Sequence, residues 1–322
     1  MLVVESARSC TGSIVVEDGG VPSPDAASPP ATSDHDTTHD ATTHDATTHD
    51  ATTHDATTHD ATTYGEAFAD VYDEWYHDIT DTDATVAALH RLAIPGLPVL
   101  ELGVGTGRVA IPLAALGHEV HGVDTSSAML SKLAANDPGG TVHTLLADMV
   151  TGLPDEQFGL VFIAYNTLFN IYTAEGQQQC FVEVTRRLAP GAVFVVEAFV
   201  PASSIASESG SSESVTVRSV TADRVVLSVS VSDAASQTAR GQYIDITEAG
   251  GVKLRPWSIR YAAPDELDDM AERAGLQLTD RFESFDKAPF TSDSPRHVSV
   301  YLTRHSPNSS LRPRPGRNDP IG

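Results

Sequence analysis

The residues best suited to chemistry form a glycine-rich turn that follows a short apolar run. Residues 99–110 read VLELGVGTGRVA, in which an acid, Glu101, precedes three glycines at alternate positions, Gly103, Gly105 and Gly107. Glycine takes backbone angles that are closed to other residues and lets a ligand approach the main chain closely. Free N–H groups at the start of a following helix favour a carboxylate or a phosphate. The pattern therefore predicts a strand, a tight turn and a helix that together bind a nucleotide-like ligand.

The glycine spacing separates two kinds of nucleotide-binding enzyme. The dinucleotide fingerprint needs G-x-G-x-x-G, and its third glycine would fall at Arg108 in this chain. The pattern present, E-x-G-x-G-x-G, resembles motif I of the class I S-adenosylmethionine (SAM)-dependent methyltransferases. An NAD-dependent oxidoreductase is disfavoured by Arg108 but stays an alternative at this point.

Further motifs fall in the order of that methyltransferase family, from Tyr64 to about Thr303. Asp124 ends the second expected strand, where an acid can accept hydrogen bonds from both ribose hydroxyls. The resemblance implies that Asp148, after the third strand, takes the adenine amino group while the next N–H, of Met149, bonds the ring. It also implies that Tyr165 lies beside the sulfonium and that SAM is the cofactor. The expected cofactor-binding residues are Tyr64, Tyr72, Glu101, Gly103, Gly105, Asp124, Met129, Asp148, Met149 and Tyr165.

A closer resemblance is to the amino-sugar N-methyltransferases of macrolide biosynthesis. It is carried by YGEAFADVYD at 64–73, ADM at 147–149 and VVE at 195–197, together with an insert after the fifth strand. In those enzymes two tyrosines of the first helix reach the methionine carboxylate, which implies this role for Tyr64 and Tyr72. The likeness is weakest near the substrate, because Asn170 stands where those enzymes tend to have a histidine, and asparagine cannot accept a proton.

The reaction implied is an in-line displacement that moves the SAM methyl group to a nitrogen or oxygen of a small molecule, such as a secondary metabolite. Holding the two reactants in line supplies much of the acceleration. An amine needs little more than desolvation and loss of a proton, whereas a hydroxyl benefits from a general base. Candidate catalytic residues are Tyr76, Asn170 and Glu197, and none is an evident base. A SAM-binding regulatory protein without turnover is the alternative from a different functional class.

Strand and helix patterns alternate along the middle of the chain. Apolar runs at 99–102, 119–123, 142–146, 158–164 and 193–196 predict strands, and the segments 82–93, 108–116, 127–135 and 175–188 predict helices. Alternation of this kind predicts a parallel sheet with helices on both faces. A helix at 264–274 and strands at 276–282 and 297–303 complete the pattern. The expected fold is a Rossmann-like α/β class I methyltransferase with a mostly parallel seven-stranded sheet.

Two further segments flank this pattern. The spacing of Phe68, Val71, Tyr72, Trp75 and Tyr76 predicts one amphipathic helix that continues to residue 79. Alternating runs at 214–220, 224–231 and 241–246 predict antiparallel strands. They form a small β insert at about 210–262, whose outer face is a candidate homodimer surface.

Composition limits the partners. The chain has 322 residues and a formal net charge of −24, which disfavours nucleic acid and anionic membranes. Its two cysteines, Cys10 and Cys180, support neither a disulfide framework nor a Cys-based metal site, and no metal is predicted. No apolar run approaches the length of a membrane span, and no basic region opens the chain, so we expect a cytoplasmic protein.

The first part of the chain is a repeat. Residues 39–63 are the pentapeptide HDATT five times over, after a shorter HDTT at 35–38. Such a segment has almost nothing to bury, so residues 1–63 and 304–322 are expected to be disordered tails around a methyltransferase domain at 64–303. The His/Asp pairs could bind divalent metals weakly, but a passive linker is the favoured interpretation.

Overall fold

The computed structural model describes residues 62–76, 80–201 and 211–304, which belong to one unit within residues 59–322. The HDATT repeat and residues 305–322 lie outside the described residues, so the two expected tails stay predictions. The same holds for the domain boundaries drawn from the sequence.

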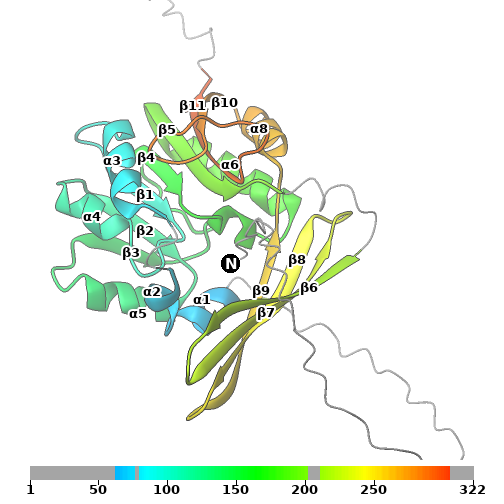
Figure 1. The fold of residues 1–322 in the computed structure, drawn as a ribbon. Coiled ribbons are helices and arrows are strands. Elements are labelled where there is room, and N and C mark those ends of the chain that lie inside the picture. The colour runs from blue at the N-terminus through cyan, green and yellow to red at the C-terminus, as the bar shows by residue number, and fades with distance from the viewer. Residues whose placement is uncertain (1–61, 77–79, 202–210, 305–322) are drawn as a thin grey trace, which may run out of the picture. The chain divides into compact units, whose positions relative to one another are not determined.

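Seven strands form the central sheet in the order β10-β11-β5-β4-β1-β2-β3 (Figure 1). The strands are β1 (Val99–Leu102), β2 (Val120–Asp124), β3 (Val142–Leu146), β4 (Phe158–Ile163), β5 (Leu188–Phe199), β10 (Leu276–Phe282) and β11 (Arg296–Thr303). β1 to β5 are parallel, and β11 runs antiparallel to both β5 and β10. Every residue of β1 and β4 is buried, as expected for central strands covered on both faces. The predicted mostly parallel seven-stranded sheet is confirmed.

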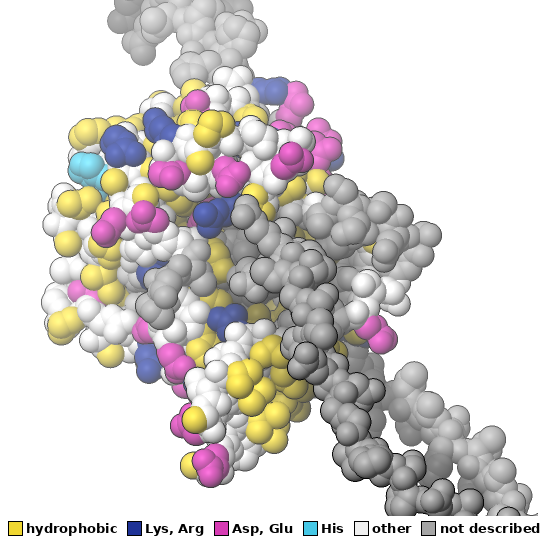
Figure 2. Space-filling model, viewed as in Figure 1, with side chains coloured by type: hydrophobic (Ala, Val, Ile, Leu, Met, Phe, Trp, Pro, Cys, Tyr) yellow, Lys and Arg dark blue, Asp and Glu magenta, His cyan; other side chains and the backbone are white. Residues whose placement is uncertain are grey.

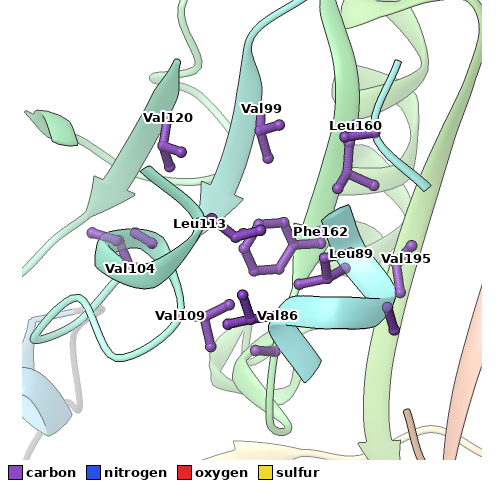
Figure 3. Packing of buried hydrophobic residues seen from close by; sticks show 14 of the residues in the cluster. Val86, Leu89, Val99, Val104, Val109, Leu113, Val120, Leu160, Phe162 and Val195 are labelled. Carbon is purple, nitrogen blue, oxygen red and sulfur yellow. The ribbon is translucent and has the colours of Figure 1, made fainter. Parts of the chain in front are cut away.

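Helices cover the two faces of this sheet. They are α3 (Thr82–Leu92), α4 (Ala110–Ala115), α5 (Ser127–Asn136), η1 (Thr167–Asn170), α6 (Ala174–Arg187) and α8 (Pro264–Arg273). On one face, Phe162 of β4 packs among Leu89 of α3 and Leu113 of α4 (Figure 3). On the other face, the ring of Phe181 from α6 packs edge-on against Phe194 of β5, with centroids 5.2 Å apart.

The predicted single helix at 64–79 is wrong. The chain forms two short helices, α1 (Thr63–Phe68) and α2 (Tyr72–Tyr76), and residues 77–79 lie outside the described part. In a continuous helix the Val71 N–H would donate to the Ala67 carbonyl, but it donates to Phe68 O at 3.0 Å. The Arg255 guanidinium donates to the Ala67 carbonyl instead, at 2.6 Å. A side chain from the β insert therefore takes the acceptor that helix continuation needs.

The insert has one strand more than its alternating runs predict. It is an antiparallel sheet of β6 (Ser211–Val220), β7 (Arg224–Asp233), β8 (Thr238–Thr247) and β9 (Gly251–Arg260), in that order. β9 reads GVKLRPWSIR, and its basic residues obscure the alternation because two of them, Arg255 and Arg260, are buried. The helix expected at 175–188 is found as α6, which ends at Arg187, and β5 follows directly.

Hydrophobic side chains gather on the surface of the insert (Figure 2). The exposed ones are Val215, Val217, Val220, Ile246, Val252 and Leu254. Clusters of this kind are typical of interaction surfaces. The homodimer through the insert stays a prediction.

Side-chain bonds connect α1 and the residues after it to α5 on one side and to the β insert on the other. Its Glu66 Oε1 accepts hydrogen bonds from Ser126 Oγ at 2.9 Å and from the Ala128 N–H at 3.1 Å, at the start of α5. On the other side, Arg255 of β9 contacts Asp70 at 2.6 Å and Asp245 at 3.4 Å. These bonds hold the N-terminal helices between the central sheet and the insert.

The Arg255 contacts predict a measurable stability difference. We expect Arg255→Met to lower the free energy of unfolding by about 2–3 kcal/mol, because removing one partner of a buried ion pair leaves the other uncompensated. The expected loss is smaller than for a fully buried ion pair, because Asp245 keeps Arg224 as a partner at 2.7 Å and Asp70 is half exposed. Urea denaturation measures it through the transition midpoint.

The matched control is the neighbouring surface pair. Lys253 Nζ lies 2.7 Å from Asp70 Oδ2, with both side chains more than half exposed. Lys253→Met is expected to change the free energy of unfolding by less than about 1 kcal/mol. Equal effects of the two substitutions would contradict the role given to Arg255.

Candidate functional site

The loop after β1 folds tightly because its three glycines, Gly103, Gly105 and Gly107, have positive φ. Gly103 has φ +73°, and a Cβ there would lie 2.2 Å from Thr167 Cγ2, so η1 leaves no room for a side chain. Its N–H donates to Val123 O at 2.7 Å, which ties the loop to β2. Gly105 has φ +55°, and a Cβ there would meet no atom within 4 Å. The loop is thus fixed at Gly103 and borders open space at Gly105.

A cavity opens beside this loop, at the carboxyl ends of β1, β2 and β3. We call it the glycine-loop cavity, and it is lined by Tyr64, Gly65, Tyr72, Gly103, Gly105, Val123, Asp124, Thr125, Met129, Ala147, Met149, Thr167 and Asn170. Seven of the ten expected cofactor-binding residues are in this lining, together with the catalytic candidate Asn170. Crevices at the carboxyl ends of parallel strands are the usual ligand sites of open α/β sheets.

Asp124 contributes a carboxyl group to the wall of the cavity. Its Oδ2 accepts the Gly105 N–H at 2.9 Å, and its Oδ1 accepts the Ser126 N–H at 2.9 Å. Burial raises the pKa of this carboxyl group above its ordinary value, and these backbone hydrogen bonds oppose that rise. One side chain therefore shapes the glycine loop and the start of α5 while facing the cavity.

Three of the expected cofactor-binding residues do not line the cavity. Glu101 is 3% exposed, and burial raises its pKa to about 8. Asp148 accepts the N–H groups of Val150 and Thr151 at 2.8 and 2.9 Å and so closes its own turn. Tyr165 lies after β4, at the edge of the aromatic residues described next. Their cofactor roles stay predictions.

The turn after β4 has unusual backbone angles. Tyr165 and Asn166 both have positive φ, at +48° and +61°, which is uncommon outside glycine. Glu197 of β5 supports this turn, because its Oε2 accepts the Tyr165 N–H at 2.9 Å. The Asn166 side chain adds a bond from the Phe199 N–H at 2.6 Å. Glu197 is thus buried beneath the turn and lines none of the cavities described here.

Aromatic rings from three segments, α2, the turn after β4 and β8, meet next to the cavity. The Tyr76 ring lies 4.8 Å from that of Tyr72 and 6.3 Å from that of Tyr165. Burial raises the pKa of Tyr72 to about 12 and moves that of Tyr76 upward as well, so both stay protonated at neutral pH. The Arg218 guanidinium lies 4.9–5.3 Å from the ring centroids of Trp75, Tyr76 and Tyr243. These three rings and Arg218 are called the aromatic cage below.

Sequence reasoning missed two members of this cage. Arg218 of β6 and Tyr243 of β8 come from the insert, where alternation alone does not tell which face packs on the rest of the protein. Arg218 also donates to the Trp75 carbonyl at 2.9 Å. A lone arginine in an alternating strand carries no signal for such a role.

A second cavity of about 320 Å³ shares Tyr72 with the first. Its lining includes Tyr76, Asp73 and Arg108. Asp73 Oδ1 accepts the Thr106 hydroxyl at 2.6 Å, which links α2 to the glycine loop. Tyr76 therefore borders this second cavity on one side and the aromatic cage on the other.

Comparison with known proteins shows the family to which this fold belongs. A methyltransferase domain model matches residues 99–191, from β1 to the start of β5. The solved structure of the CcbJ methyltransferase from Streptomyces caelestis is 40% identical, covers 77% of this chain and all of that one, and has a TM-score of 0.70. The chain belongs to the class I SAM-dependent methyltransferases.

Other relatives agree with this assignment. The methyltransferase is 28% identical over 243 residues to the cypemycin N-terminal methyltransferase of a Streptomyces species, covering 75% of this chain and 97% of that one. It shares its fold with SAM-bound CalS10, an amino pentose methyltransferase from Micromonospora echinaspora, at 20% identity and a TM-score of 0.54, over 73% and 97% of the two chains. SAM is therefore the cofactor, and the NAD-dependent oxidoreductase and the regulator without turnover are set aside.

The residues of the methyltransferase's cavity fit SAM. Within the described residues, the buried hydroxyl of Tyr64, which lines the cavity, has no hydrogen-bond partner, and polar groups this deeply buried usually have one. The Asp124 carboxyl group in the same lining can accept hydrogen bonds from ribose hydroxyls. Within the same described ranges, no helix has the length and apolar character to cross a membrane.

We expect Asp124→Asn to weaken S-adenosylhomocysteine binding at least tenfold, because a hydrogen bond to a charged group contributes about 1.5–3 kcal/mol. Isothermal titration of the full chain gives the dissociation constant. Asp148→Asn is the matched control, since Asp148 already bonds its own turn, and we expect a smaller loss from it. A larger loss from Asp148→Asn would reverse the assignment of the two acids.

Glu101 predicts a pH dependence of stability. Its folded pKa is raised, so between about pH 5 and 8 the folded chain holds a proton that the unfolded chain releases, and the free energy of unfolding falls as pH rises. Glu101→Gln removes this slope. Urea unfolding without added cofactor at pH 5, 6.5 and 8 compares the two proteins, and parallel pH profiles would contradict the buried, protonated state.

Proposed function

We propose that this methyltransferase transfers the methyl group of SAM to an amine nitrogen of a small molecule, in the class of secondary metabolites. The observation that carries the proposal is the set of candidate catalytic side chains, because none of Tyr76, Asn170 and Glu197 is suited to take a proton from an acceptor hydroxyl.

The candidate catalytic residues favour an acceptor that needs little help. Tyr76 is buried and its pKa is raised by burial, so it is a poor base at neutral pH. Asn170 cannot accept a proton. Glu197 already accepts a backbone N–H and lies beneath the Tyr165 turn. An amine acceptor fits this set better than a hydroxyl, because a hydroxyl benefits from a base during attack.

The relatives support nitrogen as the target. The cypemycin enzyme is by its name an N-terminal methyltransferase, and CalS10 is an amino pentose methyltransferase. At 28% identity the first relationship carries weight for the chemistry, while the second supports the fold alone. The particular amine belongs to the loops and the insert, since acceptor pockets are built from such parts.

The chain's own residues would then act by binding and orientation. When bound, SAM supplies an electrophilic methyl group on a positively charged sulfur. Asp124 and the hydroxyl groups of Tyr64 and Tyr72, which line the cavity, would hold the cofactor. The Asn170 amide, at the cavity wall, can orient the acceptor nitrogen. The amine loses its proton to solvent before attack, because none of the three candidates takes it.

Matched amines and alcohols test the choice of atom. The full chain is incubated with SAM and with glucosamine against glucose, cyclohexylamine against cyclohexanol, and alaninamide against lactamide. S-adenosylhomocysteine formation and product mass are measured. Methyl transfer to members of the amine set, at a rate that rises with pH as the amine deprotonates, is the expected result. Transfer to the alcohols alone would overturn the proposal.

Tyr76→Phe tests how Tyr76 acts. With the best amine from that set, we expect kcat/KM to change by less than about threefold, because the ring of the cage stays and only the hydroxyl is lost. If Tyr76 were a general base, the loss would be about 100-fold or more. Tyr72→Phe serves as the comparison, and its effect is expected mainly on the KM for SAM.

A further inference from the structure

A cluster of metal-ligating side chains lies at the opposite end of the sheet from the glycine-loop cavity. Glu119 precedes β2, His121 is the second residue of β2, and His143 is the second residue of β3. One ligand atom from each of the three can be chosen so that all lie within 4.8 Å of one another. The cofactor cavity is at the carboxyl ends of these strands, so this cluster at their amino ends is a separate site.

The two histidines are placed by the sheet itself. His121 and His143 are direct partners in the parallel register of β2 and β3, with ring centroids 5.0 Å apart. The His121 ring also packs edge-on against the buried Phe158 ring, with centroids 5.5 Å apart. Strands hold both imidazoles without any loop having to be ordered, which is the arrangement that gives a precise site.

Two carboxylates flank His121. Its Nε2 lies 3.4 Å from Glu119 Oε1 and 3.8 Å from Glu156 Oε2. In a tetrahedral zinc site with ligands about 2.0–2.1 Å from the ion, neighbouring ligand atoms lie about 3.4 Å apart. The Glu119–His121 distance matches that separation, and rotation of the His143 and Glu156 side chains would bring their ligand atoms to it.

We propose that Glu119, His121 and His143 form a binding site for a borderline divalent transition metal, with Zn²⁺ as the fitting ion and the Glu156 carboxylate as a further ligand after rotation of its side chain. Two imidazoles and two carboxylates suit zinc, nickel or cobalt, whereas magnesium and calcium prefer oxygen ligands alone. The ion would join β2 to β3. Since β3 is an edge strand with mostly exposed side chains, the site would act as a clip on this edge of the sheet.

The proposed metal site is connected to the glycine-loop cavity through β3. The strand continues at its carboxyl end into Ala147 and Met149, which line the glycine-loop cavity. Anything that binds the folded state and not the unfolded state stabilises it. Zinc is therefore expected to raise the melting temperature of the protein, and chelation with EDTA to lower it again.

The experiment must separate this cluster from the histidines of the repeat. The full chain is made with the repeat histidines changed to Asn (His35, His39, His44, His49, His54 and His59), so that they no longer contribute ligands. Isothermal titration with ZnCl₂ after EDTA treatment is expected to give one equivalent bound. In this background His143→Gln, an exposed position, and His121→Ala should each weaken binding at least about 100-fold.

Control variants make the outcome decisive. His118→Ala removes a histidine outside the cluster and is expected to leave zinc binding unchanged, and Glu119→Gln should weaken it about tenfold. Co²⁺ should give the visible absorption bands of tetrahedral coordination, which His143→Gln abolishes. Absence of a zinc equivalent, or equal affinity in the wild-type and His143→Gln proteins, would overturn the site and leave His121 as an ordinary ion-pair partner of the two glutamates.

Discussion

The position of the candidate site depends on the point in the central sheet where the strand order reverses, between β1 and β4. The chain builds β1 in the middle, adds β2 and β3 on one side, and then returns to add β4 and β5 on the other. Connections that leave β1 and β4 in opposite directions open a crevice between them at their carboxyl ends. The contact that forbids a side chain at Gly103, against Thr167 of η1, lies across this crevice. The glycine loop, the acid at the end of β2 and the turn after β4 meet there for that single reason.

The position of the N-terminal helices α1 and α2 beside this crevice depends on hydrogen bonds and ion pairs of charged side chains. α1 has six residues, too few for a helix to be stable alone in water, and its position is fixed by hydrogen bonds to α5 and β9. Arg255 is almost fully buried, and Asp70 and Asp245 balance its charge. Through this network the insert positions the tyrosines of the N-terminal helices. The cofactor cavity is thus lined by the loops after the central strands together with Tyr64 and Tyr72 of the N-terminal helices.

The two ends of β2 and β3 carry different chemistry. Their carboxyl ends face the cofactor cavity, and their amino ends carry the histidines of the proposed zinc site. An edge strand exposes backbone groups and needs protection from slipping or pairing with other chains. A metal that joins β3 to β2 would supply such protection at a distance from the reacting atoms. Binding at one end could then influence the other only through the stability of these strands.

The sequence by itself determined the sheet, the glycine loop and most of the cofactor cavity. Local patterns suffice there, because buried parallel strands are continuous apolar runs and a tight turn needs glycine. Only the tertiary structure decided the break between α1 and α2, the fourth insert strand, the aromatic cage and the approach of His121 to His143. Each of these depends on a partner far away in the chain. Arg255 donates to the Ala67 carbonyl, for example, and in the sequence alone a buried arginine cannot be told from a solvent-exposed one. The hydrogen bonds of Asp148 and Glu197 to backbone N–H groups were decided in the same way, since those N–H groups become available only in the folded turns.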